Sequence, residues 1–250
     1  MVQLDVLYNA ATHSWPSLRD RVRDAEAQGF GTAWVYDHLS GSVFNSPRML
    51  ECFTLAGALA AATSTIGIGT LVVNAANRTA GMTVSAAASV QEISGGRFVF
   101  GLGAGAAPNT KWSEEQDLLG IALPGSMAAR HERLVEVLDL CDELWDAQRD
   151  PQWTGFPLPS PRPPVLLGVN SVALAQVAGR RCEALNVRLE HPSLSDFYAA
   201  ALQARAESDR AGTPLTLTAW TSMNDASLDP NGEIQGNFAA LGGDRLILMK

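Results

Sequence analysis

Short runs of apolar and β-branched residues alternate along the chain with longer amphipathic or alanine-rich stretches. Alternation of this kind is typical of repeated strand–helix units. Eight units in 250 residues predict one domain, residues 1–250, folded as an α/β (β/α)8 TIM barrel whose functional site lies at the C-terminal ends of the strands. The eight runs cover residues 4–8, 32–36, 66–72, 97–102, 165–168, 184–187, 215–220 and 245–249.

The stretches between these runs carry helical patterns. Apolar residues recur at spacings of three and four between 128 and 145, which predicts a helix packed on a sheet. A shorter helix near 17–28 is followed by Gly29, a residue suited to the left-handed conformation after a helix end. The last strand run ends at Met249, so the pattern predicts a barrel lacking the final helix. The apolar flank left there predicts a homodimer.

Composition and charge narrow the range of partners. The chain has 26 acidic and 18 basic residues, so neither nucleic acid nor an anionic membrane is an expected partner. Its 3 cysteines are widely spaced, which indicates reduced thiols rather than a disulfide framework. The sequence shows no signal-peptide pattern and no apolar run of about 20 residues. We therefore expect a cytoplasmic protein that acts on a small molecule.

A candidate acid–base group follows the second predicted strand. Asp37 and His38 stand at the rim where barrel enzymes place their catalytic residues. A carboxylate beside an imidazole can orient the ring, so His38 could move a proton with Asp37 as its partner. An ordinary loop histidine beside an aspartate that caps a turn explains the same two residues equally well.

Two turns that contain glycine are candidates for ligand contact. Residues 101–106 formally satisfy the dinucleotide-binding pattern, but they follow the fourth strand, and Pro108 does not suit an immediate helix. Glycine at this place either lets a ring or phosphate approach the backbone or forms a tight turn. Residues 168–171 join a strand to a helix, where Asn170 or Ser171 could cap the helix and its free N–H groups could bind a phosphate.

Polar side chains also follow the third predicted strand. Thr70 and Asn74 could hydrogen-bond the polar edge of a ring, and Arg78 could pair with an anion. A solvated turn is the alternative. The remaining histidines lack metal-ligand spacing, and no nucleophile motif stands out, so no metal site is expected.

Several segments, taken in order, resemble the luciferase-like monooxygenase superfamily, and specifically its branch that uses the deazaflavin coenzyme F420. No single segment is decisive, but their order and spacing are specific, and together they cover nearly the whole chain. They are AEAQGF at 25–30, WVYDHL at 34–39, LAAATS at 59–64, IGT at 68–70, ISGGR at 93–97, GLGAG at 101–105, the helix at 133–145, GVNS at 168–171 and LGGDRL at 241–246.

The resemblance implies where a cofactor would bind. The deazaflavin ring would lie over the third strand, at a bulge whose non-prolyl cis peptide bond would fall at Leu71–Val72. Asn74 would face the ring edge, and His38, with Asp37 beside it, matches an acid–base histidine of sugar-phosphate dehydrogenases in this branch. The positions that would cradle the phosphate tail are Gly103, Ala104, Val169, Asn170 and Ser171.

The resemblance implies an F420-dependent oxidoreductase that transfers a hydride between the cofactor and a small organic substrate. One departure limits the comparison: residues 105–109 lack the glutamate that assists proton transfer in the sugar-phosphate dehydrogenases, so their substrate is not implied. An FMN-dependent monooxygenase on the same scaffold is the first alternative. A non-catalytic flavin-binding barrel is the second, because a fold alone does not establish an activity.

Overall fold

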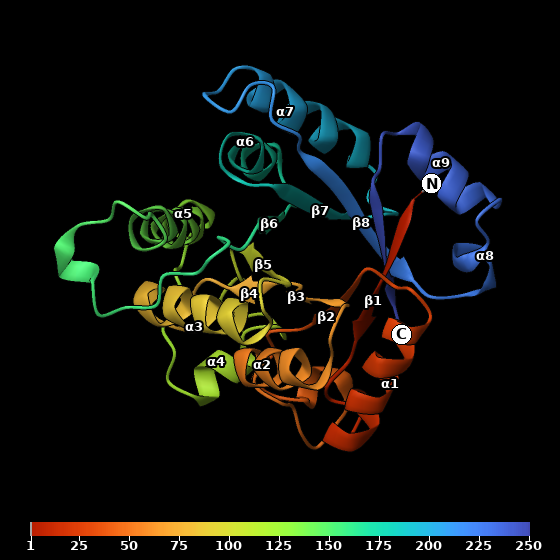
Figure 1. Ribbon diagram of the computed structural model, residues 1–250, viewed down its shortest axis with the longest axis horizontal. Helices are drawn as coiled ribbons and strands as arrows, with labels where there is room; N and C mark the ends of the chain where they lie inside the picture. Colours follow the sequence, from red (N-terminus) through yellow and green to blue (C-terminus); the bar gives the residue numbers. More distant parts are fainter. Residues whose placement is uncertain (1) are drawn as a thin grey trace.

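A computed structural model describes residues 2–250 and shows a closed barrel of parallel strands with helices outside it (Figure 1). The strands pair in the order β3-β2-β1-β9-β8-β7-β6-β5-β4, and pairing of β3 with β5 closes the ring. Both β3 and β4 pair with β5, so they are two parts of one barrel position, and the predicted eight-stranded TIM barrel is confirmed. The strands are β1 (Gln3–Tyr8), β2 (Thr32–Val35), β3 (Gly67–Thr70), β4 (Val73–Asn74), β5 (Phe98–Gly103), β6 (Val165–Gly168), β7 (Ala184–Arg188), β8 (Thr216–Ser222) and β9 (Arg245–Met249).

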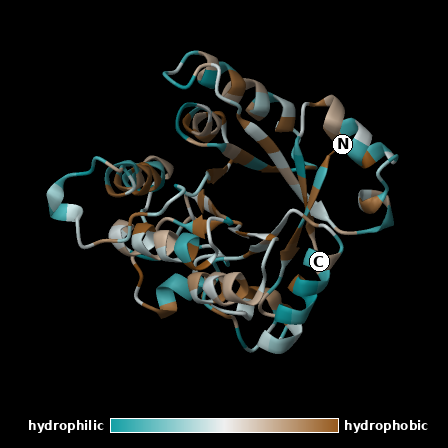
Figure 2. Ribbon diagram, viewed as in Figure 1, coloured by the Kyte–Doolittle hydropathy of each residue, from teal (hydrophilic) through white to brown (hydrophobic). Residues whose placement is uncertain are grey.

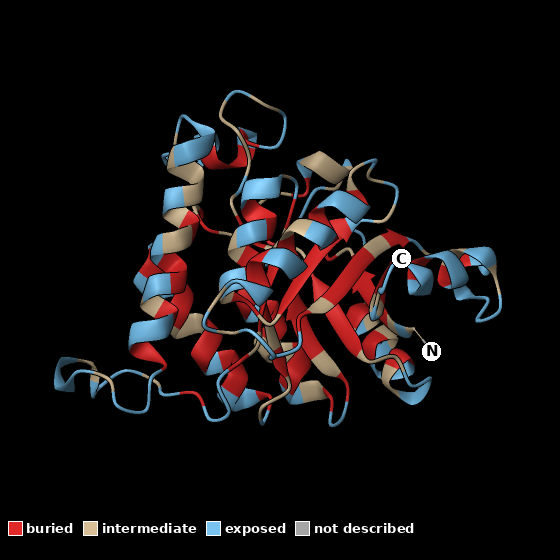
Figure 3. Ribbon diagram, turned by 90° about the horizontal axis from the view of Figure 1, so that it is seen from above, coloured by how far each residue is buried: buried red, intermediate tan, exposed pale blue. Residues whose placement is uncertain are grey.

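The helices bury their inner faces against the strands and expose their outer faces (Figure 3). Side-chain caps begin several of them; Ser126, for example, accepts a hydrogen bond from the amide of Ala129 at the start of α5. Gly29 follows α1 with φ of 82°, as predicted. The helices are α1 (Trp15–Ala27), α2 (Cys52–Ala62), α3 (Ala80–Ile93), α4 (Glu114–Leu118), α5 (Met127–Leu144), α6 (Val172–Arg181), α7 (Leu194–Ala206), α8 (Asp225–Leu228) and α9 (Glu233–Ala240), with 3-10 turns at Ser42–Phe44 and Pro151–Trp153.

Apolar side chains form two layers because successive residues of a strand point to opposite faces of the barrel wall. In β1, Val6 and Tyr8 belong to the large layer between strands and helices, whereas Leu7 belongs to a smaller cluster with Trp34 and Ile247. The strands are correspondingly rich in hydrophobic residues, while α1 carries many hydrophilic ones (Figure 2). The smaller cluster lies inside the barrel and supports the site described below.

Trp34 has room inside the barrel because the facing residue is Gly69. A Cβ atom at Gly69 would lie 2.3 Å from the indole ring, which is closer than any real contact allows. Strand β3 therefore needs glycine at this position to pack beside the fully buried tryptophan of β2.

An ion pair between a buried carboxylate and a half-buried arginine joins the first and last strands near their N-terminal ends. The Arg245 guanidinium donates from Nε and Nη2 to the two oxygens of Asp5, at 3.0 and 2.7 Å. Trp34 Nε1 donates to the same carboxylate at 3.0 Å. Three consecutive barrel strands, β9, β1 and β2, are thus linked through one carboxylate at the end of the barrel opposite the C-terminal ends of the strands.

Glu26 fixes the loop that enters β3, which gives a testable contribution to stability. Its Oε1 accepts hydrogen bonds from the amides of Ser64, Thr65 and Ile66, at 2.8, 2.6 and 3.0 Å. Burial opposes the charge, but these bonds together outweigh it and lower the pKa of Glu26 from 4.5 to about 2.

Glu26→Gln is expected to lower the free energy of unfolding by about 1 kcal/mol at neutral pH, since the amide cannot supply the charge. A depressed carboxyl pKa stabilises the fold above pH 4.5, and this contribution is lost as the pH falls toward 2. Urea unfolding between these pH values should therefore show the variant and the wild type converging. Asp24→Asn, an exposed change on the same helix, is the matched control; an equal loss in the control would contradict the explanation.

The three cysteines, Cys52, Cys141 and Cys182, are buried and unpaired. Burial is the main reason that the pKa of each thiol is raised. They are packing residues rather than reactive groups. In the part of the chain from residue 2 onward, no helix is both long and apolar enough to cross a membrane.

Candidate functional site

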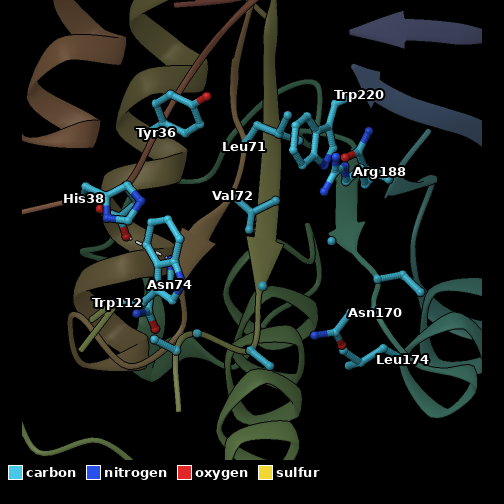
Figure 4. A pocket seen from close by; sticks show the side chains of 18 of the residues that line it. Tyr36, His38, Leu71, Val72, Asn74, Trp112, Asn170, Leu174, Arg188 and Trp220 are labelled. Carbon is cyan, nitrogen blue, oxygen red and sulfur yellow. Dashed lines mark hydrogen bonds between the residues drawn. The ribbon is translucent and has the colours of Figure 1, made fainter. Parts of the chain in front are cut away.

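A cavity of about 520 Å³ opens at the C-terminal ends of the barrel strands. This volume lies in the range of roughly 300–1,000 Å³ that is usual for cofactor and small-molecule sites. Leu71 and Val72 lie between two groups of side chains, one that includes His38 and one that includes Arg188 (Figure 4). Of the residues expected to act in catalysis or cofactor binding, all line the cavity except Thr70 and Ser171, and Arg78, the expected anion partner, also lies outside its lining.

His38 is held by a carboxylate that the sequence did not suggest. Its Nδ1 lies 3.0 Å from Oε1 of Glu115, whose side chain is only 2% exposed. The other carboxylate oxygen accepts hydrogen bonds from the amides of Leu39 and Ser40, at 2.9 Å each. Glu115 therefore fixes both the imidazole and the turn that follows it.

The contact with Glu115 indicates which nitrogen of the His38 ring carries a hydrogen. Burial disfavours the charge, but the hydrogen bonds from His38 and from the Ser40 and Leu39 amides prevail, so the pKa of Glu115 is lowered. An ionised carboxylate only accepts hydrogen bonds. Nδ1 of His38 must therefore carry the hydrogen of the bond between the imidazole and Glu115. In the neutral ring, Nε2 is then the basic nitrogen and is free to exchange a proton with a ligand.

The structure corrects the predicted partnership between Asp37 and His38. Arg78 donates to both oxygens of Asp37, at 2.8 and 2.9 Å, so its expected role in binding an outside anion is also wrong. Asp37 further accepts from the amide of Asn74 at 2.9 Å. Both residues line the cavity, but the Asp37 carboxylate is held by Arg78 and Asn74, whereas the His38 imidazole is held by Glu115.

Asp37 nevertheless connects to His38 through two amide side chains. Asn77 donates to Asp37 at 3.2 Å and accepts from Gln116 Nε2 at 2.8 Å. The same Nε2 lies 3.3 Å from Glu115, which in turn binds His38. This buried network ties the ends of β2 and β4 to α4 and limits the movement of the imidazole.

Aromatic rings surround the exposed side of His38. Its ring centroid lies 5.1 Å from that of Phe44 and 6.0 Å from that of Trp112. Tyr36 stacks on Phe44 at 5.5 Å, and burial raises the pKa of its hydroxyl to about 12. The space next to the imidazole is thus bounded by apolar surfaces and one neutral hydroxyl.

The segment between β3 and β4 carries the predicted cis peptide bond at Leu71–Val72. Thr70, just before it, was expected to contact a ligand but does not line the cavity. Its hydroxyl donates to the carbonyl of Gly101 at 2.9 Å and accepts from the amide of Gly101 at 3.0 Å. A Cβ at Gly101 would lie 1.8 Å from the Thr70 carbonyl oxygen, so the residue that begins the glycine pattern serves the close approach of two strands.

Asn74 and the glycine turn after β5 pack against each other at the cavity wall. Asn74 Oδ1 accepts from the amide of Ala76 at 2.9 Å, which directs the amide nitrogen of the side chain away from its own turn. A Cβ at Gly105 would lie 2.1 Å from that Oδ1, and Gly105 has φ of 79°. Gly103 likewise leaves space for Val72, and Ala104 completes this wall. Contact of these residues with a cofactor stays a prediction.

Residues 169–171 form the opposite wall and begin α6. Ser171 is the N-cap, and its hydroxyl accepts from the amide of Leu174 at 3.3 Å. The first two amides of this helix, at Val172 and Ala173, have no carbonyl within the helix to bond. Val169 and Asn170 line the cavity beside them. The helix end therefore offers donors for an anion, as predicted for a phosphate.

Sequence reasoning missed Glu115, Arg188 and Trp220, which come from α4, β7 and β8 and reach the same cavity. Glu115 belongs to an acidic segment that reads as a helix start, so nothing local marked it as the partner of a residue 77 positions away. Among the described residues, no group of three or more His, Cys, Asp or Glu side chains is placed to hold a metal ion.

Glu115→Gln is expected to reduce the free energy of unfolding by about 2–3 kcal/mol, because an amide nitrogen would face buried N–H donors. The sign of the pH dependence follows from the lowered pKa of Glu115: its stabilisation is complete above the usual 4.5 and declines as the pH falls through the lower folded value. Unfolding in urea at several pH values measures this difference. Glu114→Gln, which changes the exposed neighbour, should stay near wild type, and a similar loss there would contradict the assignment.

The family model for luciferase-like monooxygenases matches residues 2–227, which is most of the chain. The chain belongs to this family. It is 28% identical over 192 residues to a 5,10-methylenetetrahydromethanopterin reductase from Methanolobus tindarius, a match that covers 75% of the chain and 54% of that protein. It is 28% identical over 169 residues to an F420-dependent glucose-6-phosphate dehydrogenase from Microbacterium testaceum, which covers 64% of the chain and 48% of that protein.

This luciferase-like chain spans about half the length of the curated relatives it matches. Its fold is also that of a solved structure, an F420-dependent secondary alcohol dehydrogenase in complex with an F420–acetone adduct. The two share 17% sequence identity and superimpose with a TM-score of 0.72, over 100% of this chain and 93% of that chain. The likeness shows that the two chains share the barrel fold.

Proposed function

We propose that this protein is an F420-dependent oxidoreductase that transfers a hydride between the deazaflavin and a small organic substrate. The observation that carries the proposal is the His38–Glu115 pair, because an imidazole on the cavity lining with Nδ1 bound to a carboxylate is suited to exchange a proton at Nε2. The family match and the F420-dependent relatives support the choice of cofactor. A hydride transfer to or from a carbon–oxygen bond also needs a proton donor or acceptor, which this pair supplies.

The residues present fit a cofactor with a flat ring and an anionic tail. Leu71 and Val72 offer an apolar surface to the cavity. Val72 packs closely against Gly103, where a side chain would collide with it. The unpaired amides at the start of α6, with Asn170, offer neutral donors of the kind that bind phosphate. The residues that would hold the cofactor are Leu71, Val72, Asn74, Gly103, Ala104, Val169 and Asn170.

When bound, the deazaflavin supplies the hydride chemistry at its C5 atom. His38 would then hold or release the proton at Nε2, while Glu115 keeps the opposite nitrogen protonated and the ring in place. Tyr36 and Trp112 would exclude water from the space beside the imidazole. Asp37 would act through Asn77 and Gln116 as a positioning group, not through direct contact.

An FMN-dependent monooxygenase is the second candidate, since the matching family model is that of luciferase-like monooxygenases. Fluorescence titration of the protein with F420 and, separately, with FMN at one ionic strength tests both. Tighter binding of F420 supports the proposal, and tighter binding of FMN favours the monooxygenase. Binding of neither would make a non-catalytic barrel the better explanation.

The homodimer and the cytoplasmic location stay predictions. Light scattering at micromolar concentration tests the homodimer.

A further inference from the structure

The cavity has one cationic side chain, and it lies across from His38. Among the described residues that line the cavity, Arg188 is the only lysine or arginine. It ends β7, and Figure 4 shows its guanidinium beside Trp220, with Leu71 and Val72 between these side chains and His38. The acid–base group and the positive charge thus occupy opposite sides of one space.

The contacts that position Arg188 leave the two terminal nitrogens of its guanidinium without a partner among the described residues. Its Nε donates to Glu190 at 2.9 Å, and Glu190 is held in turn by the hydroxyl of Thr221. The guanidinium carbon lies 5.7 Å from the centre of the Trp220 ring. Within residues 2–250, no acceptor binds the two terminal nitrogens. These nitrogens are the donors that arginine uses to bind carboxylate or phosphate in a fork geometry.

His191 follows Arg188 by three residues and also lines the cavity. Its Nδ1 accepts from the amide of Ser193 at 3.1 Å, so in the neutral ring Nε2 carries the proton. Arg188 is 60% exposed on its side chain, and its ion pair with Glu190 is correspondingly weak. An anion that reaches the cavity can therefore compete for the guanidinium. The chain carries a net charge of −8, so attraction of an anion must come from such a local group.

We propose that Arg188, together with His191 and backed by Trp220, forms an anion subsite for the carboxylate or phosphate of a ligand in this cavity. The assignment of this ligand as the substrate rests on the proposed function. It then specifies the substrate class: a small organic anion whose reacting carbon reaches His38 while its charged group binds Arg188. The phosphate or carboxylates of the cofactor tail are the other source of the same chemistry.

The test uses the full chain as wild type, Arg188→Gln and Arg188→Lys, with Arg19→Gln as control because Arg19 is also paired with a neighbouring acid, Asp20. Inorganic phosphate is titrated at low ionic strength, without F420 and with saturating F420, and followed by tryptophan fluorescence. Arg188→Gln is expected to weaken phosphate binding about tenfold. The phosphate affinity of Arg188→Lys should lie between those of the wild type and Arg188→Gln. The affinity of Arg19→Gln should match that of the wild type. Thermal unfolding confirms that the variants are folded.

A third series separates the two sources of the anion. F420 is compared with the ring-bearing deazaflavin that lacks the phosphate and the carboxylate tail. Phosphate binding that persists in the F420-loaded protein and depends on Arg188 supports a substrate anion. Competition between phosphate and F420, with Arg188→Gln weakening F420 but not the tail-free ring, supports the cofactor tail. Equal phosphate affinity in wild type and Arg188→Gln would overturn the subsite. Failure of F420 to bind the wild type would remove only the proposed function, because the phosphate series without F420 still tests the subsite.

Discussion

Replacing His38 with asparagine is expected to reduce turnover by a factor of about 10² to 10⁴, the usual contribution of a general acid or base. The affinity for F420 should be unchanged, because His38 lies beside the apolar base of the cavity rather than at the amides of α6. Asparagine can still donate to Glu115, so the buried carboxylate keeps a partner, but it has no nitrogen that titrates. The loss should therefore fall on kcat and not on cofactor binding.

The measurement needs two readouts on the same preparation. Cofactor affinity is followed by deazaflavin fluorescence, and turnover by the visible absorbance of the oxidised deazaflavin with a substrate identified in a screen of small alcohols and carbonyl compounds. His131→Ala, in a different cavity on α5, is the matched control. Wild-type turnover in the His38 variant would contradict the acid–base assignment and favour a binding function for the barrel.

The barrel could be predicted because it depends on a repeating local pattern. Each of the eight predicted apolar runs coincides with a strand, and the spacing in α5 correctly indicated the face that buries Leu134, Val137 and Cys141. Burial on one face of a helix imposes its period directly on the sequence. Gly29 was correctly placed after α1 on a second local signal, the positive φ that glycine readily adopts after a helix end.

The site was predicted less completely because its contacts are long-range and directional. Thr70 follows the apolar run of β3, but its hydroxyl bonds the backbone of β5. Asp37 is adjacent to His38, yet the partner of the imidazole is Glu115, in a helix that the topology brings over the end of β2. Neither sequence spacing nor residue type reports which way a side chain points at the end of a strand.

The ion pair between Arg245 and the buried Asp5 is where we expect the largest single effect on stability. Arg245→Met removes the counter-charge of a fully buried carboxylate but preserves much of the side-chain volume. Loss of one partner of a buried pair costs about 3–5 kcal/mol. For a chain of this size that corresponds to a fall in Tm of roughly 6–20 °C, at about 2–4 °C per kcal/mol. Trp34 would remain the only side-chain donor in contact with the carboxylate among the described residues.

The pH dependence of this loss separates the charge from simple packing. Burial already raises the pKa of Asp5 above 3.8 in spite of the hydrogen bonds from Arg245, and removal of Arg245 should raise it further. A carboxyl whose folded pKa is raised destabilises the protein at high pH, and protonation relieves this cost as the pH falls toward 3.8. The stability gap between wild type and Arg245→Met should therefore narrow on acidification.

A double replacement completes the test. Asp5→Asn combined with Arg245→Met leaves no buried charge, so it should recover part of the stability that Arg245→Met loses. Arg149→Met, which removes an arginine bonded only to backbone carbonyls, is the control for side-chain loss without loss of an ion pair. The arginine would act through packing alone if the double variant were as unstable as Arg245→Met and if the stability difference between wild type and Arg245→Met did not depend on pH. The expected pattern would instead show that closure of the barrel between β9 and β1 depends on neutralising the Asp5 carboxylate.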